Sequence, residues 1–62
     1  MLYYKIKFNN DYPISEGYIE VDDSIGQMVR LTDLDGNTLQ TEGLTFGYYP
    51  IDTNPEIPSW SI

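Results

Sequence analysis

The sequence predicts an all-β domain, a small five-stranded antiparallel sheet that is curled or closed as an SH3-like barrel. The first residues alternate between apolar and polar side chains, an Asp-Gly turn follows later, and 62 residues hold five short strand-like runs. Closing such a sheet hides the strand edges that a flat sheet leaves open to aggregation. An open meander of four or five strands is the alternative architecture.

The first predicted strand covers residues 2–8, where apolar side chains recur at every second position. We expect one face of this strand to meet the core and the other to face solvent. The inward set is Leu2, Tyr4, Ile6 and Phe8, and the outward set is Tyr3, Lys5 and Lys7. Turn-forming residues at 9–16 then predict a loop with one inward anchor, Ile14 or Tyr12.

A second strand is predicted at residues 17–21, with Ile19 and Val21 inward and Tyr18 and Glu20 outward. The reversal that follows, at residues 22–26, contains Asp-Asp-Ser and Gly26. These residues could instead cap a short helix at residues 24–28. Gly26 and the Val-Arg-Leu-Thr run after it favour a strand over a helix.

Residues 27–41 predict a β-hairpin around Leu34, Asp35 and Gly36. A three-residue loop with Gly36 in the left-handed conformation pairs Leu31 with Leu39, and Thr32 with Thr38. A two-residue Asp-Gly loop would mix apolar and polar residues on each face, so the bulged turn is preferred. The inward side chains are then Val29, Leu31 and Leu39, and the outward ones are Arg30, Thr32, Thr38 and Gln40.

A fifth strand follows Gly43, with Leu44, Phe46 and Tyr48 in alternation. The predicted domain therefore occupies residues 1–50, and residues 51–62 form a proline-containing tail. Two prolines three positions apart favour extended backbone in this tail. We expect it to lie across the domain with Ile57 and Trp60 covering an open end of the core, or to dock on a partner or a second copy.

The composition narrows the possible functions of the chain. Because Cys and His are both absent, disulfides, thiolate or imidazole metal ligands and Ser-His or Cys-His nucleophiles are excluded. We therefore expect a non-enzymatic protein with no catalytic residue, no metal site and no cofactor. No signal peptide or membrane-spanning run is recognised, and a cytoplasmic location is expected.

Ten acidic side chains against three basic ones give a formal net charge of -7. This charge argues against binding to nucleic acid, which needs clustered Lys and Arg. It favours either simple solubility or a protein partner with a basic surface. Chain direction in a meander places two acidic poles at its ends. One pole is Asp11, Glu16, Asp33 and Asp35, and the other is Asp22, Asp23 and Glu42.

The segment Asp33-Leu34-Asp35-Gly36-Asn37 resembles the opening of a calcium loop, but its later positions lack the required ligands. Position nine is Thr41 and position twelve is Leu44, where a bidentate Glu is needed. The segment is better explained as a turn former. Weak binding of a divalent cation by an acidic pole remains an alternative.

The chain is rich in aromatic residues, with six Tyr, two Phe and one Trp. Outward tyrosines supply large contact areas with few rotatable bonds, which suits a protein interface. We therefore predict an interaction module that binds a protein partner through an aromatic patch and an acidic surface. The aromatic candidates are Tyr3, Tyr18, Tyr48, Tyr49 and Trp60, and the acidic candidates are Asp22, Asp23, Asp33 and Asp35. The alternative is a phage-type inhibitor or nucleic-acid mimic that blocks a basic site on a host enzyme.

Overall fold

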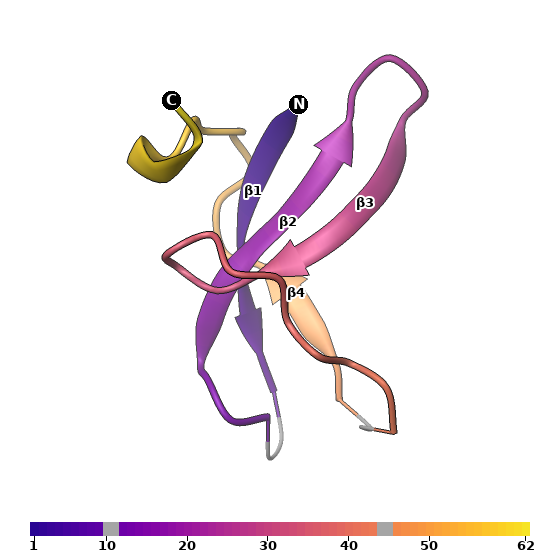
Figure 1. The fold of residues 1–62 in the computed structure, drawn as a ribbon, viewed down its shortest axis with the longest axis vertical. Coiled ribbons are helices and arrows are strands. Elements are labelled where there is room, and N and C mark those ends of the chain that lie inside the picture. Colours follow the sequence, from indigo (N-terminus) through magenta and orange to yellow (C-terminus); the bar gives the residue numbers. More distant parts are fainter. Residues whose placement is uncertain (10–11, 44–45) are drawn as a thin grey trace.

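The computed structural model describes residues 1–9, 12–43 and 46–62, and within them the fold is one open antiparallel sheet (Figure 1). Its strands lie in the order β3-β2-β1-β4. They are β1 (Leu2–Phe8), β2 (Glu16–Asp22), β3 (Gln27–Thr32) and β4 (Tyr48–Pro50), followed by a 3₁₀ turn η1 (Ser59–Ser61). The five-stranded SH3-like barrel is therefore not confirmed, and the open sheet given as the alternative fits.

The main core lies on one face of this sheet, where the alternation in the sequence placed it. Ile6, Phe8 and Leu31 are its buried centre. The rings of Phe8 and Tyr12 stack with their centroids 4.5 Å apart. The partly buried side chains that complete this core are Tyr12, Ile14, Ile19, Leu39 and Phe46. The first loop thus supplies two anchors, Tyr12 and Ile14, where one was expected.

The turn after β3 has the bulged three-residue form that its sequence predicted. The Asp33 N–H donates to the Asn37 carbonyl at 3.0 Å, and Gly36 adopts a φ of 90°. Thr32 pairs with Thr38, and the Leu39 N–H donates to the Leu31 carbonyl at 3.0 Å. The returning arm does not form a strand, however, because its regular pairing with β3 is confined to this short stretch.

A β-bulge changes the first half of β3. Glu20 pairs with Arg30, but the next residue, Val21, pairs with Met28, so Val29 is an extra residue in the ladder. Val29 is 49% exposed, and its predicted inward orientation is wrong. The helix considered at residues 24–28 is also wrong, because β3 starts at Gln27 and residues 23–26 form a turn.

The last strand is shorter and later than predicted. Phe46 does join the core, but β4 begins only at Tyr48 and pairs with β1, where Phe8 faces Tyr48. Asn9 lies at the boundary of this strand. Its backbone N–H donates to the Gly47 carbonyl, but the Gly47 N–H donates to the Asn9 side-chain Oδ1, so the regular backbone ladder begins only at Tyr48. Leu44, the predicted beginning of the fifth strand, lies outside the described residues.

The second face of the sheet is also largely covered, contrary to expectation. Tyr3 and Tyr18 are each 9% exposed because the indole of Trp60 packs on both rings, at centroid distances of 5.0 and 5.8 Å. Thr32, predicted to face solvent, is fully buried. In the tail, Pro58 is buried, whereas Ile57 is 71% exposed and does not cover the core as predicted.

Arg30 ties the second face to the turn that follows β3. Its Nε donates to Glu20 at 3.1 Å, and its Nη1 donates to the Gly36 carbonyl at 3.2 Å and to Thr38 Oγ1 at 2.6 Å. Glu20, which was predicted to face solvent, is only 6% exposed. The pairing lets a carboxylate remain buried on this face, since an unpaired one would be strongly destabilising.

Candidate functional site

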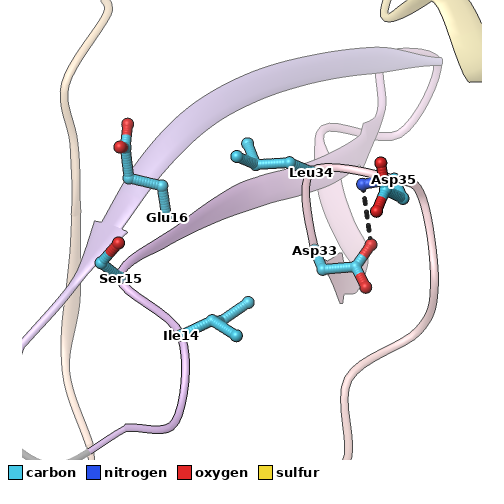
Figure 2. A pocket seen from close by; sticks show the side chains of 6 residues that line it. All are labelled: Ile14, Ser15, Glu16, Asp33, Leu34 and Asp35. Carbon is cyan, nitrogen blue, oxygen red and sulfur yellow. Dashed lines mark hydrogen bonds between the residues drawn. The ribbon is translucent and has the colours of Figure 1, made fainter.

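The candidate site is a hollow between the end of the first loop and the turn after β3 (Figure 2). Its volume is about 260 Å³. Two segments that are distant in the sequence form it. They contribute Ile14 and Ser15 from the first loop with Glu16, the first residue of β2, and Asp33, Leu34 and Asp35 from the turn. Strand direction in the sequence had already placed Glu16, Asp33 and Asp35 at one end of the sheet.

Asp33 holds the turn together rather than serving as a free charge. Its Oδ1 accepts the backbone N–H groups of Asp35 and Asn37, each at 2.9 Å, and its Oδ2 accepts the Asn37 side-chain amide at 3.0 Å. These hydrogen bonds, led by those from Asn37, lower the pKa of Asp33 below its ordinary value. The carboxylate is therefore ionised and fixed in place at neutral pH.

Glu16 and Asp35 carry the available charge of the hollow. Neither carboxylate has a hydrogen bond or an ion pair with another residue in the described ranges 1–9, 12–43 and 46–62. Figure 2 shows Leu34 between them, with Ile14 extending from the other segment. Leu34 is 44% exposed. The hollow thus combines two unpaired carboxylates with apolar side chains, an arrangement suited to a long cationic side chain.

The second predicted acidic pole does not assemble as a cluster. Asp22 and Asp23 lie at the β2–β3 turn, whereas residues 40–43, which include Glu42, lie toward the opposite end of the molecule in Figure 1. Asp22 stabilises its own turn by accepting hydrogen bonds from the Ser24 hydroxyl and N–H, and these lower its pKa. Asp11, expected at the first pole, lies outside the described residues.

The structure divides the five predicted aromatic contact residues into two groups. Trp60 packs on both Tyr3 and Tyr18 on the second face, so the three residues form a small core there. Burial, reinforced by the neighbouring carboxylates Glu20 and Glu56 respectively, raises the pKa of Tyr3 and of Tyr18. Tyr48 and Tyr49 remain 39% and 46% exposed on β4.

The apolar side of the hollow was not predicted from the sequence. Ile14 was expected as a core anchor and Leu34 only as a turn residue, yet both line the same space. The order of the strands would have indicated this, since the start of β2 and the end of β3 are neighbours in an antiparallel pair. Within the part of the chain that the structure describes, no group of three acidic side chains is arranged to hold a metal ion.

No protein family model, curated protein or solved structure matches this chain. The chemistry of the site is therefore argued from its geometry. Among the described residues, no helix has the length and apolar character that a membrane crossing requires.

Proposed function

We propose that this chain is a small acidic interaction module that binds a protein partner through Lys or Arg side chains inserted at the hollow. The observation that carries the proposal is the pair of unpaired carboxylates, Glu16 and Asp35, on either side of exposed Leu34. A Lys or Arg side chain has an aliphatic stem and a charged end, so it can use both the apolar and the acidic parts.

The overall charge supports the same type of partner. Arg30 is already engaged with Glu20, so the remaining basic side chains, Lys5 and Lys7, stand against nine carboxylates, and the net charge is -7. A negative surface of this kind accelerates the approach of a basic protein and disfavours acidic ones. Exposed Tyr48 and Tyr49 on β4 provide a second, aromatic contact area for the same partner.

A titration with a tetra-lysine peptide, followed by amide chemical shifts, tests the hollow. We expect the changes to concentrate at residues 14–16 and 33–35, since these line the hollow. Asp35→Asn should weaken binding about twofold to fivefold, the size expected for one exposed charge pair.

Glu42→Gln is the matched control, because it removes one exposed carboxylate outside the hollow. It should change the affinity for the peptide less than Asp35→Asn does. Equal weakening by both variants, with shifts spread over all acidic residues, would show general charge attraction and would refute the hollow as a site.

A further inference from the structure

A second surface of the molecule, the hairpin of β2 and β3, exposes large apolar side chains. Ile25 is 63% exposed, Met28 is 52% exposed and Val29 is 49% exposed. In Figure 1 this hairpin extends away from the rest of the sheet. Three such residues on one projecting element expose apolar area to solvent, and exposed apolar surfaces of this kind mark interaction sites.

The hairpin holds these side chains in place through a well-bonded turn. The Gly26 N–H donates to the Asp22 carbonyl at 2.7 Å, and the Asp22 carboxylate accepts the Ser24 hydroxyl at 2.6 Å. Gly26 has a φ of 68°, which suits a tight reversal. A turn fixed in this way loses little conformational entropy on binding, which favours affinity.

The β-bulge explains why Val29 belongs to this surface rather than to the core. As the extra residue between the Arg30 and Met28 pairs, it leaves the regular alternation that would have turned it inward. Met28 also reaches across the sheet, where its sulfur lies 3.6 Å from the Tyr48 hydroxyl. The apolar surface of the hairpin therefore continues toward exposed Tyr48 on β4.

Charge identifies the kind of occupant for this surface. Asp22 and Asp23 stand at the turn beside Ile25, and the amino group of Met1, 3.5 Å from Asp23, forms only an exposed ion pair. A second copy would bring the same acids and another net charge of -7 against them. An apolar groove bordered by Lys or Arg complements both features.

We infer that the β2–β3 hairpin inserts Ile25 of its turn, with Met28 and Val29 of β3, into an apolar groove with a basic rim on a partner protein. This inference deepens the proposed function and rests on it, because both require a protein partner. The hollow and the hairpin are different surfaces, formed by residues 14–16 with 33–35 and by residues 22–29. Their contributions can therefore be separated by substitution.

The inference is tested by photo-crosslinking from the β2–β3 turn in the cells that produce the protein. Ile25 is replaced by p-benzoylphenylalanine, and Ile57, which is 71% exposed in the tail, receives the same replacement as the control position. We expect position 25 to crosslink to one protein and position 57 not to do so. The crosslinked protein is then purified, and its affinity for the unmodified chain is measured.

The double variant Ile25→Ser, Met28→Ser should bind that purified protein about tenfold or more weakly, since two apolar side chains lose their buried area. Ile57→Ser should bind as the original chain does, and thermal melting should show all variants folded because these side chains are exposed. A crosslinked dimer of the chain itself, an absence of any product at position 25, or equal affinity of the double variant would overturn the inference. If Asp35→Asn weakens binding while the double variant does not, the hollow alone is used and the proposed function survives.

Discussion

The indole of Trp60 lies directly against Gly36: a Cβ added to Gly36 would be 2.5 Å from Cε3 and 2.6 Å from Cδ2 of the ring. The tail and the turn after β3 therefore pack as one unit, although they are far apart in the sequence. Gly36 serves two needs at this position. Its φ of 90° closes the bulged turn, and its lack of a side chain leaves space for the indole.

Gly36→Ala should therefore destabilise the protein more than a change of backbone preference alone would. The control is Gly26→Ala, because Gly26 also has a positive φ but no atom lies within 4 Å of its added Cβ. We expect Gly26→Ala to cost about 1 kcal/mol and Gly36→Ala about 1–3 kcal/mol more. Urea unfolding of both variants measures the difference. Equal costs would mean that the indole does not restrict this position.

Arg30→Ala should be among the most damaging polar substitutions in the chain. It leaves the carboxylate of Glu20, 6% exposed, without its partner and removes the bonds to Gly36 and Thr38. Because the Arg30 side chain is itself 31% exposed, we expect a loss of about 2–3 kcal/mol, near the lower limit for breaking a buried pair.

The double variant Arg30→Met, Glu20→Leu tests the origin of that loss. It removes the buried charge together with its partner, so it should recover much of the stability that Arg30→Ala loses. Lys7→Ala, at an exposed position of β1, should leave the unfolding free energy nearly unchanged. If the double variant is no more stable than Arg30→Ala, the unpaired carboxylate is not the cause.

The stability of the fold should fall on acidification partly through Asp33. Hydrogen bonds from Asn37 hold its pKa below the ordinary value of 3.8, so the folded state favours the ionised form. The contribution of Asp33 to the free energy of unfolding is therefore complete above the pKa that Asp33 has in the unfolded chain. It is lost as the pH falls through the lower pKa of Asp33 in the folded protein. Asp33→Asn keeps an acceptor oxygen but cannot titrate.

Melting temperatures measured from neutral pH down through this acidic range check the assignment. Asp33→Asn should lower the melting temperature at neutral pH and flatten its decline in acid. Asn37→Ala, which removes the donated side-chain amide, should produce a smaller change in the same direction. If the melting temperature of Asp33→Asn falls in acid as steeply as that of the original chain, other carboxylates cause the loss of stability.

The hairpin register and the main core could be predicted because local chemistry determines both. Gly36 permits the left-handed turn, and the period of two places Ile6 and Phe8 together. The position of Val29 could not be predicted, since a bulge moves one residue out of the alternation without a sequence signal of its own.

The covering of the second face could not be predicted for a different reason. Alternation correctly separated Tyr3 and Tyr18 from the core face, but it cannot say what lies above them. Similarly, strand direction brought Glu16, Asp33 and Asp35 to one end, while the apolar contribution of Ile14 and Leu34 depends on tertiary packing. The late start of the last strand, at Tyr48, could not be predicted either, because β4 forms by pairing with β1, a contact between distant segments.

The contact between Tyr3 and Trp60 also bears on the order of folding. The first three strands follow one another in sequence, so their sheet needs only short loops to close. The second face closes only when a distant segment returns to it, because the indole of Trp60 packs on Tyr3 and Tyr18. We therefore expect Trp60 to dock after the sheet has formed, so a folding chain presents both tyrosine rings to solvent before that step.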